Sequence, residues 1–157
     1  MYDGAAGVRI LAYKGISPLS RIIRWQTRSE YSHIAIEYDG IVIEALGTLG
    51  RVVLARDYRE FHTDGTEVDV FAVPGLYADL AWRWALEQVG LPYDYRGVMK
   101  FVSRRPAAIN GRWFCSELAA AACGVGGVEL LRIPAHESSP RDVVASPVLE
   151  WVESRVC

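Results

Sequence analysis

The sequence predicts one compact domain in which short strands and helices are mixed. The chain has 157 residues, of which 51% are apolar, and this is enough for one hydrophobic core but too little for two. Residues 67–73 alternate between apolar and polar side chains, as a half-buried strand does, whereas residues 76–89 repeat at helical spacing. Asp39-Gly40, a dipeptide suited to a type I′ turn, separates two apolar runs and predicts a β-hairpin.

Charge and apolar content exclude two broad classes of function. The net charge is −2 and the signs are interspersed, so the chain lacks the basic face that nucleic-acid binding requires. No stretch approaches the roughly 18 apolar residues of a membrane span, and the first residues do not resemble an export signal. We expect no nucleic-acid partner and no integral membrane segment. The protein is then either cytoplasmic or delivered by another machine, such as a phage particle or a secretion apparatus.

The cysteines are expected to be reduced thiols. Cys115, Cys123 and Cys157 do not form an even disulfide framework. Cys115 and Cys123 would lie two turns apart on one helix, about 12 Å by helical rise, which is too far for a disulfide. Reduced thiols are consistent with a cytosolic setting.

The first third of the chain predicts a strand, a helix and a hairpin. Residues 8–13 are a short apolar run typical of a strand. Ser17-Pro18 is a good N-cap and first-turn pair, and the side chains behind it recur at helical spacing, so we expect an amphipathic helix over residues 18–27. The hairpin occupies residues 31–45.

The rest of the chain continues the mixture. Gly90 and Pro92 end the helix of residues 76–89, and an alanine-rich run favours helix from Cys115 onward. Ser139-Pro140 predicts another capped turn. The remaining predictions are a strand at 51–54, helices at 98–102 and 147–156, a polar helical turn or loop at 57–62, and loops at 47–50, 103–110 and 132–139.

The hairpin register places a histidine and an acid on one surface. A two-residue turn pairs Tyr38 with Ile41, so His33 and Glu44 share a face on which they are diagonal neighbours. That diagonal is about 7–8 Å between backbone positions, which long side chains bridge. Glu37 lies about 13 Å from His33 along the same strand and is too distant to orient the imidazole. The competing interpretation is that both residues belong to the polar side of a half-exposed sheet.

Cys115 stands where a helix is predicted to begin. Unpaired N–H groups and the positive end of the helix dipole stabilise a thiolate there, and a cationic neighbour adds to the effect. The competing interpretation is a small buried hydrophobic residue, since a free cysteine is often buried for packing alone.

Other polar residues are expected to have structural or surface roles. Glu117 suits the dipole of the first helical turn, and His62 and His136 lie in polar or Pro-bounded segments where we expect surface histidines. No Cys-x-x-Cys or His-x-x-x-His spacing occurs, so we expect no metal. One basic group precedes Cys115 and either lines the site for anionic substrates or is an ordinary solvated loop: Lys100, Arg104, Arg105 and Arg112.

Four segments together resemble a known family. In chain order they are Tyr31-Ser32-His33-Ile34-Ala35-Ile36, Ile43-Glu44-Ala45, Gly90-Leu91-Pro92-Tyr93-Asp94-Tyr95-Arg96-Gly97 and Phe114-Cys115-Ser116-Glu117-Leu118. Their order and spacing resemble the circularly permuted NlpC-type papain-like proteins, the YiiX/YaeF-like group, in which the histidine hairpin precedes the cysteine helix. The similarity extends over most of the chain, including the closing segment that begins at Ser139.

The resemblance implies a fold and a set of roles. The implied fold is α+β, with a small antiparallel sheet of about five strands packed against the cysteine helix in a single domain of residues 1–157. Cys115 is the implied nucleophile, His33 the base and Glu44 the third polar residue, with no cofactor. Three residues are candidates for oxyanion or substrate contact: Tyr93, Ser32 and Trp113.

The chemistry expected of this set is nucleophilic acyl transfer. The leading expectation is an amidase or peptidase that cleaves a peptide, isopeptide or N-acyl bond, with cell-wall peptides or lipid-linked acyl groups as substrates. The alternatives are an acyltransferase or lipid-directed thioesterase on the same triad, and a catalytically idle structural or cargo domain.

Overall fold

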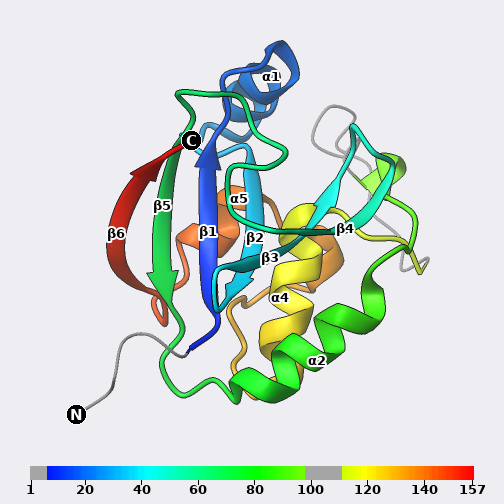
Figure 1. Ribbon diagram of the computed structural model, residues 1–157, viewed down its shortest axis with the longest axis vertical. Helices are drawn as coiled ribbons and strands as arrows, with labels where there is room; N and C mark the ends of the chain where they lie inside the picture. Colours follow the sequence, from blue (N-terminus) through cyan, green and yellow to red (C-terminus); the bar gives the residue numbers. More distant parts are fainter. Residues whose placement is uncertain (1–6, 98–110) are drawn as a thin grey trace.

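The molecule is built on one six-stranded antiparallel sheet, in an α+β fold (Figure 1). The structure is a computed structural model that describes residues 7–97 and 111–157. The strand order across the sheet is β4-β3-β2-β1-β5-β6. The strands are β1 (Arg9–Lys14), β2 (His33–Tyr38), β3 (Ile41–Leu46), β4 (Arg51–Ala55), β5 (Glu67–Ala72) and β6 (Glu150–Val156).

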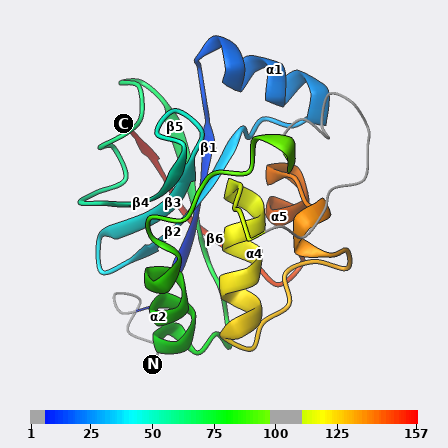
Figure 2. The same cartoon turned by 90° about the vertical axis from the view of Figure 1, so that its right-hand side faces the viewer.

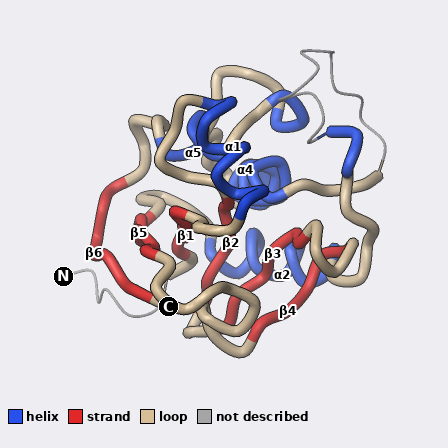
Figure 3. Tube along the Cα trace, turned by 90° about the horizontal axis from the view of Figure 1, so that it is seen from above, coloured by secondary structure: helices blue, strands red, loops and turns tan. Residues whose placement is uncertain are grey.

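The helices gather on one face and one end of this sheet. They are α1 (Pro18–Thr27), α2 (Ala78–Gln88), α4 (Cys115–Val125) and α5 (Pro140–Val144), with a 3-10 turn η1 (Ala135–Glu137). Helices α2 and α4 pack together, and α4 contacts β2 and β3 (Figure 2). Helix α1 lies at one end of the sheet, beside α5, where the Arg141 side chain donates to the carbonyl oxygen of Thr27 at 3.4 Å (Figure 3).

The described part of the chain contains no helix that is both long and apolar enough to cross a bilayer. All three cysteines are free thiols. The predicted helix at 98–102, the loop at 103–110, and Lys100, Arg104 and Arg105 lie outside the described residues.

Residues 150–156 form a strand, where a helix was predicted over residues 147–156. Strand β6 pairs antiparallel with β5 and passes a bulge opposite Val70 and Phe71. Trp151, Val152 and Val156 favour extended backbone, and the free edge of β5 supplies a hydrogen-bonding partner. This pairing makes the sheet six strands wide instead of about five.

The hairpin register is confirmed. Tyr38 faces Ile41 and Ile36 faces Ile43, around a turn in which Asp39 and Gly40 both have positive φ. The strand and helix predicted over residues 8–27 are also confirmed. The Ser17 hydroxyl accepts a hydrogen bond from the backbone N–H of Ser20 and so caps α1.

Both faces of the hairpin are buried, so its polar face is not half-exposed. One face joins a core shared with α4 that contains Ile34, Ile36 and Ile43. The opposite face joins a second cluster that contains Leu11 and Tyr13, with Tyr58 of the loop 56–66 packed against it. Acidic side chains on that second face therefore require partners inside the protein.

Helix α4 begins at Cys115, as the sequence predicted. Phe114 is its extended N-cap residue, and most of the helix is buried. The segment before it is held by strand-like pairing, since the N–H of Trp113 donates to the Pro92 oxygen and the N–H of Asp94 donates to the Trp113 oxygen. The start of the helix is thereby fixed against the end of the sheet.

Candidate functional site

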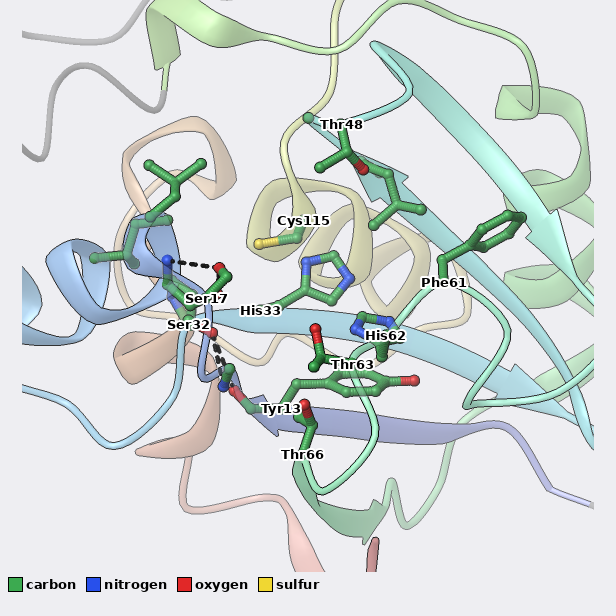
Figure 4. A pocket seen from close by; sticks show the side chains of 18 of the residues that line it. Tyr13, Ser17, Ser32, His33, Thr48, Phe61, His62, Thr63, Thr66 and Cys115 are labelled. Carbon is green, nitrogen blue, oxygen red and sulfur yellow. Dashed lines mark hydrogen bonds between the residues drawn. The ribbon is translucent and has the colours of Figure 1, made fainter. Parts of the chain in front are cut away.

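A pocket opens where the turn between β1 and α1, the hairpin and the start of α4 meet (Figure 4). Its lining includes Cys115, His33 and Ser32, together with apolar side chains from α1. With Tyr93, which also lines it, four of the residues expected to have a chemical role share one cavity, although they lie up to 83 positions apart in the chain.

Cys115 is the first residue of α4, and its thiol hydrogen-bonds to the ring of His33. Figure 4 shows the two side chains next to each other in the pocket. Its burial opposes ionisation and raises the pKa, but the hydrogen bond and charge of His33 outweigh this effect. The backbone N–H groups of Ile34 and Ser116 also hydrogen-bond to the sulfur. The net result is a pKa of the thiol below its ordinary value, which favours a thiolate.

His33 lies between the thiol and an acid. Its Nε2 is 2.7 Å from Glu44 Oε2, and the ring also hydrogen-bonds to Cys115. Burial pulls the pKa of the imidazole down, but the hydrogen bonds and charges of Cys115 and Glu44 raise it to about 10. The favoured state of the pair is therefore a thiolate beside an imidazolium.

Glu44 is fully buried and its Oε2 lies within hydrogen-bonding distance of two imidazoles. The second contact is to His62 Nε2, at 2.8 Å. Burial raises the pKa of this carboxyl, yet the hydrogen bonds to His33 and His62 lower it to about 2. An ionised carboxylate only accepts hydrogen bonds, so both Nε2 atoms carry a proton. The other ring nitrogen of His33 is then free to exchange a proton with Cys115.

The placement of Glu44 against His33 follows from the hairpin register, in which they are diagonal neighbours. Glu37, on the same face, pairs instead with Arg155 at 2.7 Å. Each buried acid on this face therefore has a different cationic or imidazole partner.

His62 is not a surface histidine, and that prediction was wrong. Its side chain is only 12% exposed, and its ring stacks on Tyr13 with centroids 3.8 Å apart and an interplanar angle of 17°. The loop 56–66 that carries it is tied down from distant parts of the chain. Tyr13 donates its hydroxyl to the Tyr58 oxygen, and the N–H of Cys157 donates to the Thr66 oxygen.

The local sequence around His62 gave no signal of this role. It lies 18 residues from Glu44 in a polar loop without periodicity, and only the folding of that loop over the sheet brings them together. His136, by contrast, lies in η1 near Glu137 and outside the pocket lining.

Tyr93 lines the pocket and is 9% exposed. Burial raises the pKa of its phenol, and the charge of Cys115 raises it further, so the hydroxyl keeps its proton. A protonated hydroxyl close to the sulfur is a suitable hydrogen-bond donor for an oxyanion.

Ser32 also lines the pocket, but its hydroxyl is already engaged. The backbone N–H of Gly15 donates to Ser32 Oγ at 3.0 Å, which fastens the turn between β1 and α1. A Cβ added at Gly15 would collide with the hydroxyls of Ser20 and Ser32. The structure therefore gives Ser32 a supporting role for the wall of the pocket.

Trp113 is not placed with the other site candidates. Its indole N–H donates to Gln88 Oε1 at 3.2 Å, and its ring meets Trp84 edge-on, so the side chain packs against α2. It is not among the residues that line the pocket. Ser116, next to the nucleophile candidate, donates its hydroxyl to the Ser138 oxygen and supports the start of α4.

The fold has a solved counterpart. The chain is similar to the crystal structure of the metalloprotein yiiX from Escherichia coli, with a TM-score of 0.69 and 18% sequence identity. The likeness covers 99% of this chain and 100% of that one. At this identity it shows a shared fold and nothing about the site. No model of a known protein family matches the chain, and no curated protein matches it.

Proposed function

We propose that the protein is a cysteine hydrolase, an amidase or peptidase, with Cys115 as nucleophile, His33 as base and Glu44 as the residue that orients the imidazole. The observation that carries this proposal is the continuous series of contacts from the thiol through His33 to Glu44. Burial alone would neutralise these groups. Their mutual hydrogen bonds and charges keep them charged, with further hydrogen bonds from His62 to Glu44 and from the backbone to Cys115.

The proposed reaction proceeds through an acyl-enzyme. The thiolate of Cys115 attacks the carbonyl carbon of an amide, and a carbon–sulfur bond forms while the carbonyl electrons move to oxygen. His33 donates its proton to the leaving amine as the carbon–nitrogen bond breaks. His33 then takes a proton from water, which hydrolyses the thioester and releases the acid. Glu44 holds the ring in the tautomer with the proton on Nε2 throughout.

The negative oxygen formed during attack requires donors. The backbone N–H of Cys115 is one candidate, because the first N–H groups of a helix have no partner within the helix. The hydroxyl of Tyr93 is the second. A donor of this kind contributes about 2.7–4 kcal/mol to lowering the barrier.

We further propose that the chain belongs with the circularly permuted NlpC-type papain-like proteins. The order of the hairpin before the cysteine helix supports this assignment, as does the fold shared with a protein named yiiX. The proposed substrates are peptides or acyl amides, with cell-wall peptides and lipid-linked acyl groups as the first classes to test.

A metal-dependent hydrolase is the second candidate, and a specific cluster favours it. His33, Glu44 and His62 each offer a ligand atom, and these atoms lie within 4.8 Å of one another. Two imidazoles and a carboxylate form many catalytic zinc sites, in which the ion activates water. Within the described residues, Glu44 Oε1 is buried without a hydrogen-bond partner and so retains free lone pairs. The structural neighbour is called a metalloprotein, which is a statement about that protein.

The contacts at Glu44 are the hydrogen bonds that the thiol hydrolase requires. Ligand atoms held about 2.0–2.1 Å from a tetrahedral ion lie about 3.3 Å apart. The two imidazole nitrogens are instead 2.7 and 2.8 Å from Glu44 Oε2, which are separations that a shared proton produces. The two candidates also compete for one atom, since His33 Nε2 either donates to Glu44 or binds the ion.

One experiment separates them. Peptidoglycan fragments, ubiquitin-like conjugates and phospholipids are incubated with the wild-type protein, with Cys115→Ala and with chelator-treated protein, and the products are identified by mass spectrometry. A thiol hydrolase loses its product in Cys115→Ala and keeps it after chelation. Activity that survives in Cys115→Ala but disappears with the chelator contradicts the thiol mechanism and supports the metal site.

A further inference from the structure

Helix α1 presents its apolar side chains to solvent. None of its residues is buried. Leu19, Ile22 and Trp25, spaced three residues apart, are 59%, 53% and 77% exposed. A short helix is normally held to a protein by its apolar stripe, because such helices are marginally stable alone. Here that stripe points outward, and Figures 1 and 2 show the helix at one end of the molecule.

The same helix carries a stripe of positive charge. Arg21, Arg24 and Arg28 recur at spacings of three and four, so they follow one side of the helix next to the exposed apolar stripe. Residues 16–29 contain no acid, although the whole chain has a net charge of −2. Arg24 donates to the Gly15 oxygen. Arg21 and Arg28 are exposed and form no salt bridge with the described residues.

This helix is also a wall of the pocket. Leu19 and Ile23 of α1, together with Ile16 just before the helix, line the cavity that contains Cys115 and His33. Phe61, which is 38% exposed, lies on the other side of the same cavity (Figure 4). A surface that covers α1 therefore comes close to the opening through which a substrate reaches the thiol.

We propose that α1 docks on a membrane surface that bears anionic lipids, and that the pocket takes substrates held at that surface. Leu19, Ile22 and Trp25 insert at the boundary between headgroups and acyl chains, while Arg21 and Arg28 contact the lipid phosphates. An amphipathic helix with exposed Trp and Leu beside arginines has the chemistry of an interfacial anchor. A helix that protrudes from the molecule can insert into a bilayer, because the bilayer surface deforms around it. Arginines that form no salt bridge with the described residues attract the anionic headgroups. The docking stands independently of the reaction, whereas the class of substrate rests on the proposed function.

Vesicle flotation tests the docking without any catalysis. Cys115→Ala protein is mixed with vesicles of phosphatidylcholine alone, or of phosphatidylcholine and phosphatidylglycerol in equal amounts. We expect binding to the anionic vesicles and little to the neutral ones. Arg21→Gln and Arg28→Gln each lower the partition coefficient about fivefold. Trp25→Ser lowers it by about tenfold or more, because the largest apolar side chain no longer inserts.

The matched control is Trp151→Ser, which removes another exposed tryptophan, 63% exposed against 77% for Trp25, from β6 at an edge of the sheet. Its binding should equal that of the parent, and circular dichroism should show all variants folded. The proposal is overturned if neither vesicle binds, or if Trp25→Ser and Trp151→Ser reduce binding equally. A dimer in analytical ultracentrifugation that Trp25→Ser dissociates would assign this face to a second copy of the chain and also overturn it.

The substrate part of the proposal has its own measurement. Wild-type protein is given one acyl amide in two forms, free in solution and anchored in the anionic vesicles. We expect faster cleavage of the anchored form and loss of that advantage in Trp25→Ser. If neither form is cleaved, the proposed hydrolase activity is contradicted. The flotation result still stands in that case, because it does not depend on catalysis. Equal cleavage of both forms counts against the membrane as the source of substrate.

Discussion

His62 Nε2 lies 2.8 Å from Glu44 Oε2, the same oxygen that meets His33 Nε2 at 2.7 Å. One buried carboxylate oxygen therefore holds two imidazoles, one of which faces the thiol. The stack of His62 on Tyr13 fixes the outer imidazole in turn. The proposed triad is thus anchored by the loop 56–66 as well as by the hairpin.

The first prediction concerns this outer imidazole. His62→Phe keeps a ring over Tyr13 but removes the donor to Glu44, whereas His62→Ala removes both. Because a hydrogen bond to a charged group contributes about 1.5–3 kcal/mol, His62→Phe should lower the free energy of unfolding by that amount. Urea unfolding measures it. His62→Ala should lower the free energy of unfolding further, because it also removes the ring that stacks on Tyr13. If His62→Phe is as stable as the wild type, the hydrogen bond from His62 to Glu44 contributes nothing to stability.

The second prediction concerns the pH dependence of Cys115 alkylation. The pKa of its thiol is lowered, while that of Cys157 is raised mainly by burial and that of Cys123 is raised to about 12, also mainly by burial. The rate of iodoacetamide labelling at pH 6 should be higher for Cys115 than for either other cysteine, and it should rise less steeply between about pH 6 and pH 8. An ordinary thiol gains about tenfold per pH unit over the same range. Peptide mapping follows each cysteine separately.

His33→Ala is the decisive variant for that measurement. Without the imidazolium, burial dominates and the pKa of Cys115 rises, so labelling at pH 6 should fall by about a hundredfold. If Cys115 is labelled no faster than Cys157 at pH 6, and His33→Ala changes nothing, the thiol is structural.

Much of this site was predictable because its determinants are local. The Asp39-Gly40 turn fixes the hairpin register, and the register brings Glu44 rather than Glu37 to His33. The alanine-rich run after Cys115 fixes where α4 begins. In each case a few consecutive residues carry the information.

The missed features depend on contacts between distant segments. Strand β6 is extended because β5 offers it an edge, some 80 residues away. His62 is buried because Tyr13 and the chain end hold its loop over the sheet. The absence of close His and Cys spacings predicted no metal, yet the fold gathers potential ligands from positions 33, 44 and 62. Patterns within a short stretch of sequence do not predict these long-range contacts.

The third prediction concerns Glu44 and acid stability. Its folded pKa of about 2 lies below the ordinary value of 4.5, so its contribution to stability is fully present above about pH 4.5 and is lost as the pH falls toward 2. The shift corresponds to about 3 kcal/mol. Glu44→Gln should be less stable at pH 7 and show a flatter decline in this acid range, measured by thermal unfolding at a series of pH values.

Glu37→Gln is the matched control for that variant. Glu37 is also a buried acid on the same face, but its partner is Arg155. Both variants should lose stability at pH 7, and only Glu44→Gln should slow the alkylation of Cys115 at pH 6, because Glu44 is the one of these two acids that raises the pKa of His33. Equal alkylation in the two variants would remove Glu44 from the proposed triad.

The last prediction separates the oxyanion donor from the activation of the thiol. Tyr93→Phe removes a protonated hydroxyl next to Cys115 without changing the ring that packs against Gly47. Hydrolysis of the substrate found by mass spectrometry should slow by about a hundredfold to a thousandfold in kcat. Alkylation of Cys115 forms no oxyanion, so its rate should stay the same. Tyr95→Phe is the control, because that hydroxyl donates to the Gly47 oxygen at 2.6 Å and its loss should leave kcat unchanged. Equal kcat in Tyr93→Phe and the wild type would leave the backbone N–H of Cys115 as the principal donor.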